Sequence, residues 1–126
     1  MTNAQKPIIA IVDDDVSVRG SLVALVQCSG YSAVSFSSAE DFLQEDALPE
    51  AKFLIVVVRL PGMSGIEVLA QLANTGRTRP AVVVTGHADS QELQQAPQLA
   101  GVCFLSKPCA PEALLEVIAA SIDPAR

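Results

Sequence analysis

Five short apolar segments divide the chain at intervals, and polar segments with helical spacing lie between them. Each apolar segment holds five or six residues, rich in Val, Ile, Leu and Phe and mostly unbroken in hydrophobicity. Strands that are buried on both faces of a parallel sheet have this pattern. We therefore predict five parallel strands, at Ile8–Val12, Ser32–Phe36, Phe53–Val58, Ala81–Thr85 and Val102–Ser106.

Helical patterns fill most of the intervals between these strands. Residues after Asp15 have apolar positions three and four residues apart, and Gly30 is placed to end this helix. Ser37–Glu40 has the capping-box pattern that opens a short helix. Two further amphipathic helices are predicted, one that stops near residues 74–76 and one that begins at Pro111. The apolar positions that define these helices are Val18, Leu22, Leu25, Val26, Ile66, Leu69, Leu72, Leu114, Leu115, Val117 and Ile118.

The interval between the fourth and fifth strands gives a weaker helix signal. Residues 88–101 hold few apolar positions, and Pro97 removes an amide donor and clashes with the preceding turn. We predict a short or irregular fourth helix in this interval. The alternation of strands and helices predicts a doubly wound α/β domain around a parallel sheet.

Polar residues follow the carboxyl ends of several predicted strands. Asp13 and Asp14 follow the first strand, Thr85 ends the fourth, and Lys107 follows the fifth. Loops diverge at this edge of an open parallel sheet, and binding sites form there. The third strand differs from the others, because it ends in aliphatic residues before the loop at 59–65, which reads R-L-P-G-M-S-G.

This order of motifs resembles the receiver domain of response regulators in two-component signalling, over about residues 8–122. The resemblance rests on the acidic pair, the loop after the third strand, Thr85, and the Lys107-Pro108 pair that lies 22 residues beyond Thr85. The nearest branch has a third strand and loop that read L-D-V-R-L-P-G-M-S-G. It implies a flavodoxin-like (βα)5 fold with a five-stranded parallel sheet in the order 2-1-3-4-5. The aspartate of that motif accepts the phosphoryl group, and Val57 stands at its position here.

The resemblance also implies which residues would bind a metal. Asp14 would ligate Mg²⁺ directly, Asp13 would act mainly through water, and the backbone carbonyl of Arg59 would complete the protein ligands. Magnesium takes oxygen ligands, and Val57 supplies neither such a ligand nor a nucleophile. We therefore expect no acyl phosphate at this position and only weak Mg²⁺ binding, at millimolar concentrations or above. A β-branched residue should also suit a buried strand better than a third carboxylate.

The remaining residues of this degenerate pocket have two interpretations each. By resemblance, Thr85 and Lys107 would contact phosphoryl oxygens, and Phe104 would be the aromatic residue that moves with the Thr hydroxyl on activation. Without a phosphoryl group, Thr85 can bond to local backbone and Phe104 can simply pack in the core. Lys107 can belong to a turn, or pair with Asp13 or Asp14.

Composition narrows the classes of function. The 126 residues suit one domain, taken as 1–126 with its core at 8–122, and we expect no output domain. No apolar run approaches about 18 residues and the start lacks a signal core, so we expect a cytoplasmic domain without a membrane span. Eight basic and fourteen acidic residues give a net charge of -6, without the basic cluster that nucleic-acid binding needs. We interpret Cys28, Cys103 and Cys109 as reduced, ordinary small apolar residues, and a redox switch at the last two is disfavoured.

The leading hypothesis is a receiver-like interaction module that works without phosphorylation and has no enzymatic activity. Its partner would be a histidine kinase, a downstream regulator or a second copy, bound through the fourth helix, fifth strand and last helix. The alternative is an ordinary phospho-accepting receiver whose acceptor was replaced by mutation or recent loss. A flavodoxin-like nucleotide binder is disfavoured, because residues 13–15 are all Asp and would repel a phosphate. Phosphorylation at Asp13, Asp14 or Ser64 instead would be inefficient.

Overall fold

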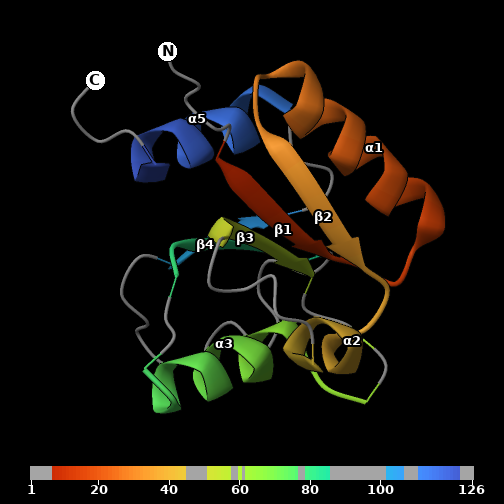
Figure 1. The fold of residues 1–126 in the computed structure, drawn as a ribbon, viewed down its shortest axis with the longest axis vertical. Coiled ribbons are helices and arrows are strands. Elements are labelled where there is room, and N and C mark those ends of the chain that lie inside the picture. Colours follow the sequence, from red (N-terminus) through yellow and green to blue (C-terminus); the bar gives the residue numbers. More distant parts are fainter. Residues whose placement is uncertain are drawn as a thin grey trace.

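A parallel sheet forms the centre of the domain, with helices on both of its faces (Figure 1). The computed structural model describes residues 7–44, 51–57, 60, 62–76, 79–85, 102–106 and 111–122, except the side chains of 85, 102, 104 and 106. Within these residues the sheet has five strands in the order β2-β1-β3-β4-β5, all parallel. This is the predicted order. The strands are β1 (Ile8–Val12), β2 (Ser32–Phe36), β3 (Ala51–Val57), β4 (Ala81–Thr85) and β5 (Val102–Ser106).

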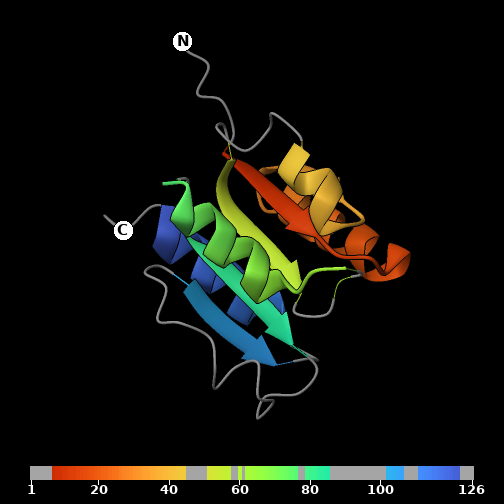
Figure 2. The ribbon, with the colours of Figure 1, turned by 90° about the horizontal axis from the view of Figure 1, so that it is seen from below.

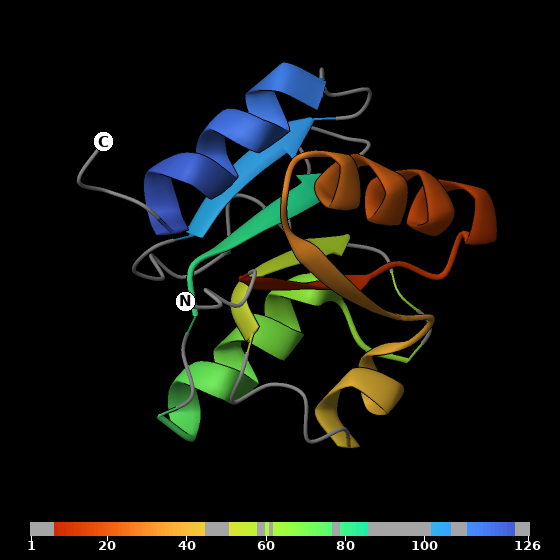
Figure 3. The ribbon, with the colours of Figure 1, turned by 45° about the horizontal axis from the view of Figure 1, so that its top comes forward.

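The described helices cover opposite faces of this sheet. They are α1 (Val16–Cys28), α2 (Ala39–Gln44), α3 (Gly65–Asn74) and α5 (Pro111–Ile122). Figures 1 and 3 show α1 and α5 together on one face, with α2 and α3 on the other. Seen from below, α2 and α3 lie in front of the sheet (Figure 2). The predicted doubly wound, flavodoxin-like class is therefore confirmed, whereas the predicted irregular helix at 88–101 lies outside the described residues.

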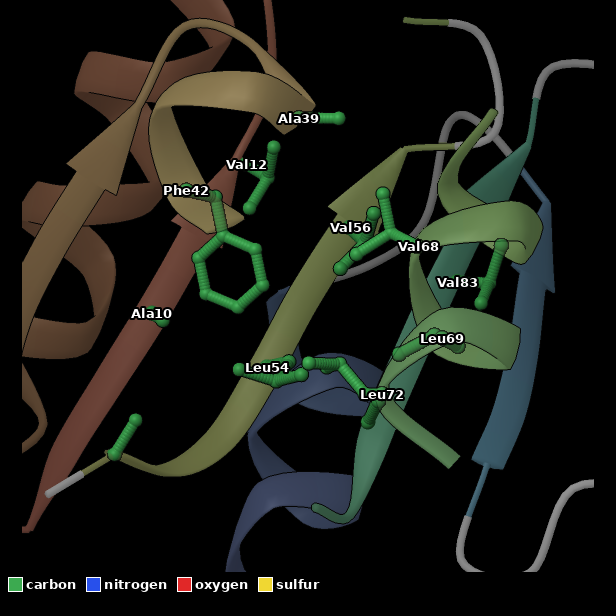
Figure 4. Packing of buried hydrophobic residues seen from close by; sticks show 12 residues of the cluster. Ala10, Val12, Ala39, Phe42, Leu54, Val56, Val68, Leu69, Leu72 and Val83 are labelled. Atoms are coloured by element: carbon green, nitrogen blue, oxygen red, sulfur yellow. The ribbon is translucent and has the colours of Figure 1, made fainter. Parts of the chain in front are cut away.

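Two apolar cores separate the sheet from its helices. Alternate strand residues point to opposite faces, so each strand contributes to both cores. The core between the sheet and α2 and α3 is drawn in Figure 4 and includes Ala10, Val12, Phe42, Leu54, Val56, Val68, Leu72 and Val83. The core under α1 and α5 includes Ile9, Ile11, Val26, Phe53, Ile55, Val57, Val82, Val84, Leu114 and Ile118. Burial on both faces explains why the strands show unbroken apolar runs in the sequence.

Strand β3 begins two residues before the predicted start at Phe53. The pairing of β1 with β3 shifts register, because Ile8 pairs with Ala51 whereas Ile9 pairs with Phe53. Lys52 is thus an extra residue on β3, and its side chain is exposed. The apolar run starts only after this lysine, which is why the sequence pattern placed the strand too late. Val58, the predicted last residue, lies outside the described residues.

The predicted capping box at Ser37–Glu40 is wrong by one residue. The backbone N–H of Asp41 donates to the Ser38 hydroxyl oxygen at 3.1 Å, so Ser38 caps α2. The phase of this helix is set by burial, because Ala39 and Phe42 both pack in the core against α3 and the sheet. Ser37 cannot serve as the cap without rotating these side chains away from the core.

A complete capping box instead opens α3. The Glu67 N–H donates to the Ser64 hydroxyl at 3.1 Å, and the Ser64 N–H donates to a Glu67 carboxylate oxygen at 2.8 Å. Replacing Ser64 by alanine should lower the free energy of unfolding by about 1 kcal/mol, because the Glu67 N–H loses its side-chain acceptor. Urea denaturation measures this loss. Glu67→Gln keeps an acceptor and should cost less, and equal stability of Ser64→Ala and the native chain would contradict the assignment.

Candidate functional site

The carboxyl ends of the central strands meet at one edge of the sheet. Figure 2 shows the arrowheads of β1, β3, β4 and β5 pointing to the same side. In the register of the sheet, Val12 pairs with Val56, and Val57 pairs with Val84. Asp13 follows Val12 directly, so it reaches the level of Val57 on the neighbouring strand. The structure thus places the start of the acidic run and the Val57 position at the same level of the sheet.

Asp13 is buried and held by its backbone and side chain. Its side chain is 1% exposed, and one carboxylate oxygen accepts the Asp15 N–H at 2.9 Å. Its own N–H donates to the Phe36 carbonyl at 3.1 Å, and its carbonyl accepts an Arg19 guanidinium N–H at 2.7 Å. These bonds fix the turn between β1 and α1, because they join Asp13, which follows β1, to Asp15 and Arg19 at the start of α1. The sequence signal for Arg19, a charged residue near the start of an otherwise uncharged helix, was not used in the prediction.

The two acids that follow Asp13 have different surroundings. Asp14 is exposed to solvent and is therefore the acid at this edge that an incoming cation can reach most easily. Asp15 is the N-cap of α1, and its carboxylate accepts the Val18 N–H at 3.1 Å. A carboxylate at a helix N-terminus is stabilising there. Only the first two of the three consecutive aspartates are therefore available for a pocket.

Val57 lies in an aliphatic environment at the end of β3. Its side chain is 4% exposed and belongs to the core cluster under α1 and α5, which contains Ile11, Ile55 and Val84. The backbone of Val57 is covered by Gly65, the first residue of α3. A Cβ at Gly65 would overlap the Val57 carbonyl oxygen and lie 2.6 Å from a Val56 methyl carbon. The end of β3 and the start of α3 are therefore in direct contact, which the sequence pattern did not reveal.

The described residues at this edge do not make a dedicated magnesium site. Mg²⁺ requires near-octahedral oxygen coordination, and the two acids here are one buried and one exposed carboxylate beside an aliphatic side chain. In the part of the chain that the structure describes, no group of three or more His, Cys, Asp or Glu side chains could hold a metal ion.

The other predicted pocket residues are only partly placed. Thr85 ends β4, and Phe104 of β5 pairs with Val83 of β4, but the side chains of Thr85 and Phe104 are not described. Lys107 and Arg59 lie outside the described residues, so their expected contacts stay predictions.

The cysteines do not show the burial that is usual for this residue type. Cys28 and Cys103 are free and exposed, whereas Cys109 lies outside the described residues. An unpaired cysteine is ordinarily among the most buried residues of a protein. These two cysteines are thus unpaired, as the interpretation of them as reduced residues requires, but they are exposed, which is unusual for a small apolar residue. Exposure follows from their positions, at the end of α1 and on the edge strand β5.

A doubly wound parallel sheet carries an acidic pair after β1, and a capping box opens α3 after β3. Together these features are typical of a signalling domain of the two-component type. The family model of the response regulator receiver domain matches residues 9–119, so the chain belongs to this family. It is therefore a receiver domain of two-component signal transduction.

Individual relatives are similar over nearly the whole chain. Nodulation protein W of Bradyrhizobium diazoefficiens is 36% identical over 118 residues, which is 94% of this chain and 52% of that protein. The transcriptional regulatory protein FixJ of the same organism is 37% identical over 116 residues, 90% of this chain and 56% of that protein. The crystal structure of FixJ-N has a TM-score of 0.81 at 31% identity and covers 95% of this chain and 96% of that one.

The chain spans about half the length of the curated relatives that it matches. Among the described residues, no helix combines the length and the apolar character needed to cross a membrane.

Proposed function

We propose that this receiver domain acts as a protein-interaction module whose conformation is not set by phosphorylation. The observation that carries the proposal is Val57, an aliphatic residue 4% exposed at the end of β3, where the family motif has its phospho-accepting aspartate. An acyl phosphate requires a carboxylate oxygen, and a valine side chain has no nucleophilic atom. The usual activation step cannot occur at this position.

The packing around Val57 supports a stable domain in one conformation. Its methyl groups belong to an apolar cluster with Ile11, Ile55 and Val84, and its carbonyl is covered by Gly65. A carboxylate at this place would be desolvated beside the buried Asp13, and both effects raise the free energy of the charged form. Valine removes that cost. We propose that Asp13 and Asp14, with Lys107 as their counter-charge, remain as a degenerate pocket that binds Mg²⁺ weakly.

The second candidate is an ordinary receiver that lost its acceptor by mutation or recently. The retained residues Asp13, Asp14, Thr85 and Lys107 favour it, because a pocket that had long been unused need not keep all four residue types. Both candidates describe the same chemistry for the present chain. In either case the partner we propose is a histidine kinase or a downstream regulator, and the domain itself catalyses no reaction.

Intact-mass measurement after incubation with acetyl phosphate and Mg²⁺ tests the proposal. The native chain should gain no phosphoryl group, whereas Val57→Asp should gain one, because it restores an oxygen nucleophile beside the two acids. Val57→Asn is the matched control, since it is polar and similar in shape but is not a carboxylate. Phosphorylation of the native chain would mean that another residue accepts the group, and the proposed mechanism would then be wrong.

A further inference from the structure

Arg19 carries the positive charge that is nearest in the sequence to the acidic run. It is the one Lys or Arg between Lys6 and Lys52. It lies at the end of the first turn of α1, four residues after Asp15 and six after Asp13. Figure 2 shows that the connection from the arrowhead of β1 to the start of this helix is short. The side chain of Arg19 therefore begins close to the three aspartates.

The Arg19 guanidinium contacts the end of β1. One of its N–H groups donates to the Asp13 carbonyl at 2.7 Å, and the Arg19 side chain is half-buried. A hydrogen bond from a charged donor at this distance is among the stronger ones in proteins. The acceptor belongs to a residue that is 1% exposed, so water competes little for the bond. Arg19 is thus anchored to the backbone of the buried aspartate.

This contact completes a set of bonds around the turn between β1 and α1. The Asp13 N–H donates to the Phe36 carbonyl, and an Asp13 carboxylate oxygen accepts the Asp15 N–H. Arg19 supplies a donor for the remaining backbone group of this residue, the Asp13 carbonyl. The backbone N–H of Arg19 also donates to the Asp15 carbonyl at 2.8 Å. One residue therefore holds the turn at both Asp13 and Asp15.

Three consecutive aspartates require a positive charge close by. Asp13 is desolvated, and Asp14 and Asp15 follow it directly, so repulsion among the three carboxylates disfavours a compact turn. A hard cation such as Mg²⁺, which takes oxygen ligands, is one source of that charge. The Arg19 guanidinium is another. It contacts a backbone carbonyl oxygen, which is a class of atom that hard cations also take as a ligand.

We propose that Arg19 takes the place of a bound cation at the turn between β1 and α1. Its guanidinium holds the Asp13 carbonyl and offsets the charge of the aspartates, so the turn forms without a divalent cation. The same positive charge repels a divalent cation from the acidic edge. Arg19 is thus a positioning residue that keeps the affinity for Mg²⁺ low, in addition to the counter-charge proposed for Lys107. This inference rests on the proposed degenerate pocket, for whose weak Mg²⁺ binding it gives a second cause besides Val57.

Arg79 provides a matched control at the opposite edge of the sheet. Its Nε–H donates to the Ala51 carbonyl at 3.1 Å, so it too is a guanidinium bonded to a backbone carbonyl. Ala51 begins β3 and Val57 ends it, which places the two edges about 20 Å apart. Arg79→Gln removes the same charge as Arg19→Gln and alters the same kind of contact, but far from the aspartates. It therefore measures the effect of net charge alone on Mg²⁺ binding.

Titration with MgCl₂ at low ionic strength, followed by the amide NMR signals of the turn, tests the effect of the Arg19 charge. Even at the dielectric constant of water, removing a unit positive charge about 8 Å from a divalent cation strengthens its binding about fivefold. We therefore expect Arg19→Gln to bind Mg²⁺ at least about fivefold more tightly than the native chain. Arg19→Lys, which keeps the charge, and Arg79→Gln should stay within about twofold of the native affinity. An Arg19→Lys variant that binds Mg²⁺ as tightly as Arg19→Gln overturns the inference.

Hydrogen exchange tests whether Arg19 holds the turn. The Asp15 and Val18 amides donate to the carboxylates of Asp13 and Asp15, respectively. Without Mg²⁺ these two amides should exchange at least about tenfold faster in Arg19→Gln, because the Asp13 carbonyl loses its charged donor. Mg²⁺ should slow them again in the variant and change the native rates little. The Ile55 amide in β3 should accelerate less, and equal acceleration there, or unchanged turn amides, would contradict a local role of Arg19.

The proposed function and the role of Arg19 can fail separately. Every variant in these two experiments keeps Val57, so their results leave the phosphorylation test unaffected. Tight Mg²⁺ binding by the native chain would show that the weak pocket and the role of Arg19 are both wrong. Weak binding by both the native chain and Arg19→Gln would leave the pocket as proposed and overturn the role of Arg19 alone.

Discussion

Replacing Gly65 by alanine should lower the free energy of unfolding by about 3 kcal/mol, a large fraction of the stability of a domain this size. The new Cβ would overlap the carbonyl oxygen of Val57 and press on a methyl group of Val56 at 2.6 Å. Both neighbours belong to the central strand β3, which cannot shift without disturbing its pairing on both sides. Helix α3 would therefore have to move away from the sheet and expose part of the core that it covers.

Urea denaturation of Gly65→Ala beside Gly20→Ala tests this expectation, because the same chemical change is made in two helices. At Gly20 a Cβ meets nothing within 4 Å, so that substitution should stabilise the domain by about 1 kcal/mol. Opposite signs are therefore expected for the two variants. If Gly65→Ala were as stable as the native chain, the contact between β3 and α3 would be looser than the structure indicates.

Val57→Asp should destabilise the domain by about 3 kcal/mol when no divalent cation is present. The side chain at this position is 4% exposed and packs among aliphatic residues, so a carboxylate there would be largely desolvated. The buried Asp13 follows β1 directly and lies level with residue 57 of the neighbouring strand β3. Its carboxylate would therefore repel the new one. Val57→Asn isolates the cost of burying a polar group from the cost of the charge, and should lose less stability.

Magnesium should recover part of the stability that Val57→Asp loses. A ligand that binds only the folded state at ten times its dissociation constant adds about 1.4 kcal/mol. The variant offers three carboxylates and should respond in this way, whereas the native chain should change by less than about 0.5 kcal/mol at the same concentration. Thermal denaturation with and without Mg²⁺ measures both. A native chain stabilised as much as the variant would show that two acids suffice and that Val57 does not limit metal binding.

These two predictions concern opposite sides of one junction. The side chain of Val57 packs in the apolar core under α1 and α5, and its carbonyl limits how closely α3 can approach β3. In this chain both sides are packed without a charge. We expect the junction to be more rigid than in the Val57→Asp variant, and hydrogen exchange of the first turn of α3 should be slower in the native chain.

The sequence was sufficient for the parts of this protein that depend on short-range patterns. Continuous apolar runs indicated strands buried on two faces, and helical spacing between them indicated a doubly wound sheet. The order of the acidic pair and the loop at 59–65 was sufficient for the family. Each of these motifs lies within a few neighbouring residues, so the sequence shows it directly.

Details that depend on how elements pack were missed or misplaced. The start of β3 depends on an irregular pairing with Ile8, and the cap of α2 depends on which side chains face the core. Neither can be predicted from a local pattern, because the register of a strand depends on the neighbouring strand. The position of a helix cap likewise depends on which helix residues pack in the core.

By itself, then, the sequence determined the fold class, the family and the absence of a nucleophile at Val57, since residue identity and spacing carry all three. Only the tertiary structure decided that Asp13 is buried while Asp14 is exposed, and that Gly65 covers the Val57 backbone. The physical reason is that burial and contact belong to pairs of segments distant in the chain, and a single segment does not contain that information.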